Sequence, residues 1–274
     1  MIEALLAGRW IGVWRRNYLV WRKLAAASIA GNIIDPLFYL LGFGLGFATM
    51  VPEVEGVKYI AFLAGGTICY TTMLAASFEA LYSGFARMHV QRTWEGIMNA
   101  PVGLEDVVLG EWVWAASKSL LSGTAILLVA LALGIGGSWT MALIVPLAFL
   151  IGLAFAGMGM VMTAVAKSYD FFTYWFTLVL TPQMLLCGVF FPTAGLPSWV
   201  QAVASALPLT HAIAIGRPLF LGQWPEGALV HAAVLADLPD LSAHEVYACG
   251  NPLMIDAARS SFTATAGLPA ERFL

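Results

Sequence analysis

The sequence predicts an all-α membrane protein, and three observations support this fold class. Hydrophobic residues make up 60% of the 274 positions and charged residues only 11%, whereas a soluble domain carries about 25% charged residues. The mean hydropathy of the chain is +0.83. Apolar runs long enough to cross a bilayer recur along most of the chain. The net charge of −3 comes with few, scattered basic residues, which argues against a nucleic-acid-binding protein.

The N-terminal thirty or so residues predict a helix that lies in the membrane interface. On a helical wheel Trp10, Trp14 and Trp21 fall within about 40° of one another. The basic residues on the other side are Arg9, Arg15, Arg16, Arg22 and Lys23. Indoles at headgroup depth opposite a basic face are typical of the water–lipid boundary. The alternative is an ordinary core helix of a soluble domain.

The apolar runs predict five transmembrane spans, since a span needs about 20 residues. They lie at about 35–52, 58–80, 107–133, 140–165 and 171–191. Asp35-Pro36 is typical of an N-cap followed by proline at the first helical position, or the first helix begins upstream and tolerates the proline.

The basic residues of the loops predict the orientation. Arg87 and Arg92 lie in the 81–106 loop and Lys167 in the 166–170 loop, whereas the 134–139 loop has no basic residue. The positive-inside rule therefore places the N-terminus and the 81–106 loop in the cytoplasm. Five spans then leave the chain outside the cytoplasm after Phe191.

The stretch after the fifth span is divided by Pro192, Pro197 and Pro208 into pieces too short to cross a bilayer. They predict two short helices at about 196–216 that enter the outer leaflet, where protein must cover the broken backbone. The alternative is an unusually apolar loop.

Two ordered motifs carry a resemblance to a known family. The first has these residues: Gly188, Phe191, Pro192, Pro197, Trp199, Pro208, His211 and Arg217. The second runs from Arg92 to Val102 and is followed by Leu109-Gly110-Glu111. Over about residues 1–225 the chain resembles ABC-2 type transporter permeases, which implies a bacterial inner-membrane protein. Within that family it looks most like the nodulation-protein-J group, permeases for lipo-oligosaccharide export.

The resemblance implies how such a permease is powered. It implies six spans, a homodimer in membrane lipid, and two cytoplasmic ABC ATPase subunits that bind ATP and Mg. Residues 84–101 would form the coupling helix that receives the ATPase movement, and its docking residues are predicted to be Arg92, Trp94, Glu95 and Met98. The alternative is a solvated interfacial loop. The chain itself has no GxxxxGK[ST] phosphate loop, so it is predicted to be no enzyme and to bind no cofactor.

Polar residues inside spans are candidates for a substrate path. Glu111 and Lys118 share one helix face two turns apart, too far for a direct pair unless the lysine bends back, and snorkelling to the interface is the simpler interpretation. Gln183 either faces the substrate or bonds a neighbouring helix. Small residues at Gly42, Gly46, Gly152, Ala156 and Gly159 predict close helix packing. We recognise no catalytic constellation and no metal site; the three cysteines lie far apart.

Residues 226–274 predict a small α/β-like fragment in place of a sixth span. Their sequence resembles the end of the NAD(P)H-binding domain of ferredoxin-reductase-like flavoenzymes. That resemblance places Cys249 and the Gly250 turn near a nicotinamide ring. A fragment of this length lacks the rest of the nucleotide fold, and any NAD site in it would therefore be vestigial. The sequence predicts that the tail was joined to the permease part at a junction between two unrelated reading frames.

Three interpretations of function follow. The first is the permease subunit of an ABC exporter for a lipid-linked or amphiphilic glycan, or for a drug or other small amphiphile. The second is a multi-span protein of another class, such as a secondary transporter, although the internal repeats expected of one are not seen. The third is an inactive chimaera of a truncated permease and a reductase fragment.

Overall fold

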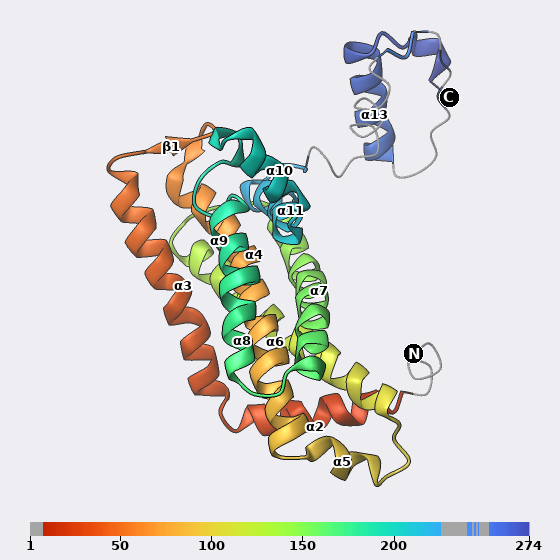
Figure 1. The fold of residues 1–274 in the computed structure, drawn as a ribbon. Helices are drawn as coiled ribbons and strands as arrows, with labels where there is room; N and C mark the ends of the chain where they lie inside the picture. The colour runs from red at the N-terminus through yellow and green to blue at the C-terminus, as the bar shows by residue number, and fades with distance from the viewer. Residues whose placement is uncertain (1–7, 226–239, 243, 245, 247–251, 274) are drawn as a thin grey trace. The chain divides into compact units, whose positions relative to one another are not determined.

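The computed structural model describes residues 8–225, 240–242, 244, 246 and 252–273, and Figure 1 shows its course. The chain divides into two compact units, Met1–Gly222 and Gln223–Leu274. Unit 1 is a helical bundle. Helices α2 (Trp10–Arg22) and α5 (Thr93–Met98) lie at one end of it, called here the α5 end, and the hairpin β1 (Glu53–Val54)–β2 (Val57–Lys58) lies at the other, the hairpin end (Figure 1).

Helix α4 (Tyr59–Phe78) is the centre of the bundle. It packs against α3 (Ala25–Ala48), α6 (Leu104–Ala132), α7 (Ile144–Val165) and α11 (Pro208–Leu221). A helix that is apolar on all sides is expected to be buried. The hydroxyls of Thr67 and Thr72 are satisfied within the helix, because they donate to the backbone carbonyls four residues earlier, whereas the buried Ser77 hydroxyl has no partner among the described residues.

Three of the predicted spans coincide with helical stretches that are long and apolar enough to cross a membrane. Among the described residues these are Tyr59–Val90, Leu104–Ala132 and Trp139–Val165. The first runs ten residues further than the predicted 58–80, because two π-helical segments, Glu79–Ser83 and Ala86–Val90, continue α4. The residues expected to begin a cytoplasmic loop at 81 are therefore helical.

The predicted spans 35–52 and 171–191 have different bounds in the structure. Helix α3 begins at Ala25, so Asp35-Pro36 lies inside it and is not its N-terminus. The second stretch consists of α8 (Asp170–Trp175), the π-helical segment Phe176–Leu180 and α9 (Thr181–Leu186). It ends before 191 because Gly188 adopts φ +82°, the left-handed conformation that commonly terminates helices.

The two predicted short helices are present as α10 (Ser198–Ala206) and α11, bent by 88° relative to each other. Pro208 begins α11, where a missing N–H costs nothing. Gly222 at φ +84° ends α11 at Leu221, five residues beyond the predicted end.

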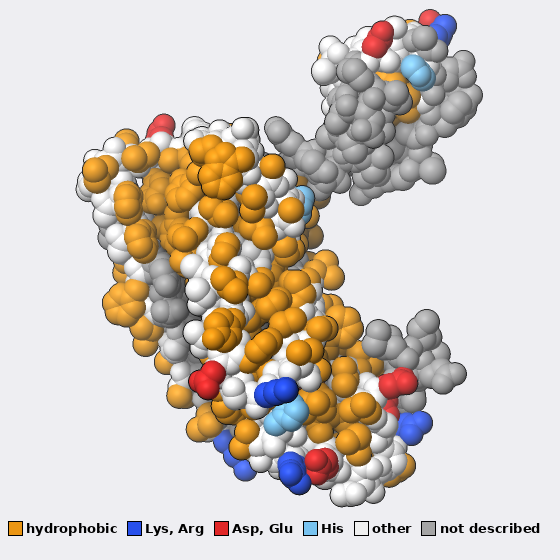
Figure 2. Space-filling model, in the orientation of Figure 1, with side chains coloured by type: hydrophobic (Ala, Val, Ile, Leu, Met, Phe, Trp, Pro, Cys, Tyr) orange, Lys and Arg blue, Asp and Glu red, His pale blue; other side chains and the backbone are white. Residues whose placement is uncertain are grey.

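The side chains of unit 1 separate by polarity along its length. On the face drawn in Figure 2, hydrophobic side chains cover most of the bundle, and most of the charged ones gather towards the α5 end. The exposed apolar residues include Leu128, Leu150, Val161, Leu178 and Trp199. Continuous exposed apolar surface of this extent is expected only where lipid or protein covers it.

Unit 2 contains one described α-helix, α13 (Pro252–Thr265), within the predicted α/β-like fragment. Leu241, Phe262 and Leu268 form its small apolar cluster together with Ala266 and Phe273. Val246 makes an isolated parallel bridge with Phe273. Cys249 and Gly250, which the resemblance places near a nicotinamide ring, lie outside the described residues.

Candidate functional site

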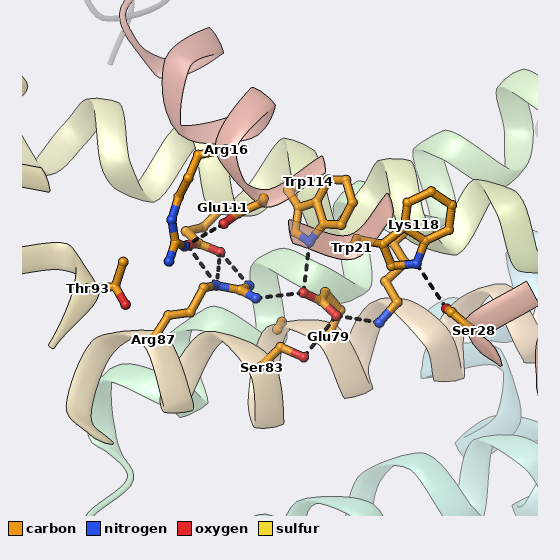
Figure 3. A network of polar contacts seen from close by, with 12 residues as sticks. Arg16, Trp21, Ser28, Glu79, Ser83, Arg87, Thr93, Glu111, Trp114 and Lys118 are labelled. Carbon is orange, nitrogen blue, oxygen red and sulfur yellow. Dashed lines mark hydrogen bonds and ion pairs between the residues drawn. The ribbon is translucent and has the colours of Figure 1, made fainter. Parts of the chain in front are cut away.

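A buried ionic network occupies the α5 end of unit 1 (Figure 3). Its members come from the π-helical continuation of α4, from α5 and from α6. They are Glu79, Ser83, Arg87, Trp94, Glu111, Trp114 and Lys118. π-helical turns inside α-helices are frequent at functional sites, and here both π-helical segments carry a network residue.

Arg87 joins the two carboxylates of the network. Its Nη1 lies 3.0 Å from Glu79 Oε1, and its Nη2 lies 2.6 Å from Glu111 Oε2. Its Nε also donates to both Glu111 oxygens at 2.9 Å. The guanidinium therefore binds Glu111 in the bidentate manner that lysine cannot reproduce, and it links α4 to α6.

Glu79 is 3% exposed and accepts hydrogen bonds from three further donors. Lys118 Nζ lies 2.6 Å from Oε2, Trp114 Nε1 lies 2.8 Å from Oε1, and Ser83 Oγ lies 2.9 Å from Oε2. A carboxylate so deeply buried is tolerated only when its charge is paired and its oxygens are hydrogen-bonded. Glu79 meets both conditions.

Helix α5 is connected to this network by Trp94, whose Nε1 donates to Glu111 Oε1 at 3.3 Å. Trp94 is 6% exposed, so its side chain faces the bundle and is not on the outer surface of α5. The other three predicted docking residues, Arg92, Glu95 and Met98, are exposed. The predicted coupling helix 84–101 is thus a short helix, Thr93–Met98, that follows the end of the long helix at Val90.

Glu111 and Lys118 are paired with other helices and not with each other. The expectation that Glu111 snorkels to the interface is wrong, because its side chain is 2% exposed and bound to Arg87. Lys118 is 25% exposed and bound to Glu79. Sequence reasoning did not find these pairs, since Arg87 was assigned to a loop and its partner Glu111 lies 24 residues away.

The tryptophans of α2 pack on α6, contrary to the prediction that they lie among lipid headgroups. Trp114 makes edge-to-face contacts with Trp14 and Trp21 at 6.3 and 6.1 Å between ring centroids. Trp14 Nε1 also donates to Ser117 Oγ at 3.1 Å. The wheel placed Trp14 and Trp21 on one face, but these two indoles face the protein. The exposed apolar residues of this segment include Ile11, Leu19, Val20 and Leu24.

Gly110 allows this close approach of α2. A Cβ at Gly110 would lie 2.6 Å from Val13 Cβ and 2.8 Å from the Trp10 carbonyl oxygen. Arg16, also on α2, extends towards the Arg87–Glu111 pair (Figure 3). Burial, and next the positive charge of Arg87, lower the pKa of the Arg16 guanidinium below its ordinary value.

Gln183 bonds a neighbouring helix, the second of the two alternatives predicted for it. It is 1% exposed. Its Nε2 donates to the Val179 carbonyl at 3.3 Å, and its Oε1 accepts from the Leu209 backbone N–H at 3.3 Å. The side chain thereby satisfies one of the free N–H groups in the first turn of α11.

Arg217 organises the hairpin end. Its Nε donates to the Phe62 carbonyl at 3.1 Å, and its Nη2 donates to the carbonyls of Gly188 and Val189. The guanidinium carbon lies 3.6 Å from the centroid of the Phe62 ring, within the range of a cation–π contact. Arg217 thus holds the chain that follows α9 against α4.

Other residues of the first motif lie between the end of α9 and the first turn of α11. Phe191 and Pro192 line an apolar cavity of about 490 Å³ together with Phe43, Phe47 and Tyr59. The His211 Nε2 lies 2.9 Å from the Ser205 carbonyl oxygen. Trp199 is 72% exposed, and Pro197 directly precedes α10.

Gly66 beside Arg217 yields a stability prediction with an internal control. A Cβ there would lie 2.8 Å from both Arg217 Nη2 and the Val189 carbonyl oxygen, whereas nothing lies within 4 Å of one at Gly42. We expect Gly66→Ala to destabilise the fold by about 1–3 kcal/mol through overpacking, and Gly42→Ala to be neutral. Thermal unfolding in one detergent measures both; equal melting temperatures would contradict the packing.

The glycine contacts also correct one packing prediction. Gly152 lies against Ala116 and Ser119, and Gly159 against Ala80, as expected of small-residue packing faces. Among the described residues, a Cβ at Gly42 or Gly46 would meet nothing within 4 Å, whereas a Cβ at Gly44 between them would lie 3.0 Å from the Ile60 side chain. In the described parts of the chain, no three His, Cys, Asp or Glu residues are grouped as metal ligands would be.

Comparisons with known proteins agree with the architecture. Residues 3–221 match the ABC-2 type transporter family. The chain is 49% identical over 230 residues to Nodulation protein J of Bradyrhizobium diazoefficiens, covering 84% of this chain and 87% of the relative. It is 48% identical to Nodulation protein J of Rhizobium meliloti, covering 82% and 84%. It is 24% identical to the inner membrane transport permease YadH of Escherichia coli, covering 77% and 82%.

No solved structure matches the chain. The family match ends at residue 221, and the resemblance of the tail to a reductase domain finds no support in these comparisons. The match covers α2 to α11 and both the ionic network and the Arg217 cluster. The chain therefore belongs to the ABC-2 type transporter family.

Proposed function

We propose that this chain is the membrane permease subunit of an ABC exporter that moves a lipid-linked or amphiphilic glycan, of the lipo-oligosaccharide class, out of the bacterial cytoplasm. The family match and the relatives named Nodulation protein J support the class of protein. The apolar cavity at the hairpin end suits the apolar part of an amphiphile, since ligand cavities are lined mainly by apolar side chains.

The observation that carries the proposal is the connection of α5 to the spanning helices. Trp94 and Arg87 both bind Glu111, and Arg87 also binds Glu79. A displacement of α5 therefore acts on α6 directly and on α4 through one guanidinium. In this proposal the N-terminus and the α5 end face the cytoplasm, and a homodimer of the chain forms the transport path.

The power source in this proposal is a separate cytoplasmic ABC ATPase subunit, which binds ATP and Mg. Arg92, Glu95 and Met98 form its docking surface on α5, since these three side chains are exposed. Trp94 transmits the movement inward. Glu111 and Lys118 serve the coupling network, and Gln183 serves helix packing, so none of the three is assigned to the substrate.

The docking surface gives a direct prediction. We expect the double variant Glu95→Lys with Met98→Asp to lose co-purification with the ATPase subunit by at least about tenfold, because it reverses one charge and inserts another into the contact. The control is Lys167→Glu, an equal charge reversal at an exposed position of another loop on the same side. Unchanged recovery of the ATPase with the double variant would reject this surface.

The transport activity is tested in vesicles that contain the chain and its ATPase subunit. We expect ATP-dependent movement of a labelled lipo-oligosaccharide across the membrane, and none with an ATPase unable to hydrolyse ATP. Movement of a small drug-like amphiphile but not of the glycan would replace the substrate class. Loss of all transport with normal ATPase binding would support the inactive chimaera.

A further inference from the structure

A polar cavity of about 270 Å³ lies beside the ionic network. It is bounded by α2, by the π-helical continuation of α4 and by α6. The charged side chains that line it are Arg16, Glu79, Arg87 and Lys118. Together with Glu111, which is paired with Arg87, the group holds three cations and two carboxylates, an excess of one positive charge.

Arg16 is the one cation of this group that is not paired with a carboxylate of the group. Arg87 is bound by both carboxylates and Lys118 by Glu79. Arg16 Nη1 donates to Asn17 Oδ1 at 2.9 Å, and within the described ranges no carboxylate lies within ion-pair distance of it. A guanidinium has five donors, so Arg16 retains donors for an anion in the cavity.

Asn17 provides an independent indication. It lines the same cavity and is 3% exposed, yet its amide Nδ2 has no hydrogen-bond partner in the described structure. A buried amide donor without a partner costs about 1–3 kcal/mol, and such groups are rare enough to require a reason. A bound acceptor in the cavity would remove this cost. Lys118 can contribute as well, because only one of its three N–H groups donates to Glu79.

From these groups we infer that the cavity binds the phosphate of an anionic lipid headgroup. A phosphate oxygen accepts from a guanidinium, an ammonium and an amide, the three donors that Arg16, Lys118 and Asn17 present. The surroundings favour a lipid over free phosphate: Val20, which lines the cavity, is 53% exposed, and Leu19 and Leu24 beside it are 46% and 69% exposed. An acyl chain can lie on that apolar surface while its headgroup enters the cavity.

The test uses the purified full-length chain in neutral detergent, titrated with phosphatidylglycerol or with phosphatidylcholine of the same chain length. Native mass spectrometry counts the bound lipid. We expect phosphatidylglycerol to bind at least about tenfold more tightly, since the choline cation opposes the excess positive charge. This comparison requires no variant. Equal affinity for the two lipids would overturn the inference.

Variants locate the site. Arg16→Gln and Asn17→Asp are each expected to weaken phosphatidylglycerol binding by about tenfold or more, and Arg16→Lys to retain most of it. The matched control is Arg15→Gln, which removes the adjacent, exposed charge of α2. Equal weakening by Arg15→Gln would show unspecific attraction and overturn the site. Melting temperatures of all variants identify any that fail to fold.

Inorganic phosphate distinguishes the two sources of the anion. If millimolar phosphate displaces phosphatidylglycerol from the wild type and binds Arg16→Gln more weakly, the anion site is supported but its ligand is free phosphate. If phosphate does not compete, the lipid headgroup is the ligand. This experiment contains no ATPase and no transport substrate, so its outcome is independent of the proposed function.

Discussion

Arg87→Met is expected to lower the free energy of unfolding by about 3–5 kcal/mol, the largest effect of any single change in the ionic network. The substitution leaves Glu111 and one side of Glu79 as buried carboxylates without their cation, and removing one partner of a buried pair has a cost of this size. Thermal or denaturant unfolding in detergent measures the change. Arg87→Lys should recover only part of it, because one ammonium cannot reach Glu111 in bidentate fashion and Glu79 at once.

A double variant shows whether Arg87→Met destabilises the fold through an unpaired buried charge or through lost packing. In the double variant Arg87→Met with Glu111→Met, the unpaired charge at Glu111 is gone, and Glu79 keeps Lys118 at 2.6 Å. Replacing both partners of a buried pair by apolar residues is often neutral or stabilising. The double variant should therefore be more stable than Arg87→Met alone. If it is less stable by a further 3 kcal/mol or so, the ionic account of this network is wrong.

Arg217→Met is expected to lower the free energy of unfolding by about 2–5 kcal/mol, through a different mechanism. No paired charge is lost; instead the carbonyls of Phe62, Gly188 and Val189 lose their donor, and the stacking on the Phe62 ring disappears. Each buried carbonyl left without a partner costs about 1–3 kcal/mol. Arg217→Lys should rescue little, since a single ammonium cannot replace the planar group over the ring.

The same variant should also change the apolar cavity, because the cavity residues Phe190, Phe191 and Pro192 follow the Gly188 and Val189 carbonyls to which Arg217 donates. Tyr59 supports that segment from the other side, where its hydroxyl donates to the Phe190 carbonyl at 3.1 Å. An increase in the fluorescence of an apolar dye bound to the chain would show a loosened cavity wall. If the variant binds the dye as the wild type does and melts at the same temperature, Arg217 does not support the wall of the cavity. His211→Ala is the matched control, since its ring contacts only the nearby Ser205 carbonyl among the described contacts.

Local patterns in the sequence were sufficient for the parts of the fold that depend on length and chain geometry. The apolar runs around α6 and α7 exceed the bilayer thickness, and Pro197 and Pro208 interrupt the following stretch at intervals too short for a span. The motif residues Gly188 and Arg217 were selected by resemblance, and the structure brings them together across 29 residues of chain.

The ionic network could not be predicted because its pairs are distant in sequence. Arg87 and Glu111 are 24 residues apart and Lys118 and Glu79 are 39 apart, so no helical periodicity connects them. Gly84, Arg87 and His89 are also typical of a polar loop, and the two buried carboxylates that pair with Arg87, Glu79 on the same helix and Glu111 on α6, are not visible in the local pattern. The tryptophans of α2 show the same limit: a wheel groups side chains on one face but does not say whether protein or lipid covers that face.

The position of the two arginines gives α4 a mechanical property. Arg217 is bonded to its backbone at Phe62 and Arg87 to its side chain at Glu79, two points about 25 Å apart along a helix of ordinary rise. Between them the helix is largely buried, and the hydroxyls of Thr67 and Thr72 donate to its own backbone, so it has little freedom to bend. A displacement or rotation applied at the α5 end would therefore reach the wall of the apolar cavity with its amplitude largely preserved, because the helix between the two arginines moves as a rigid body.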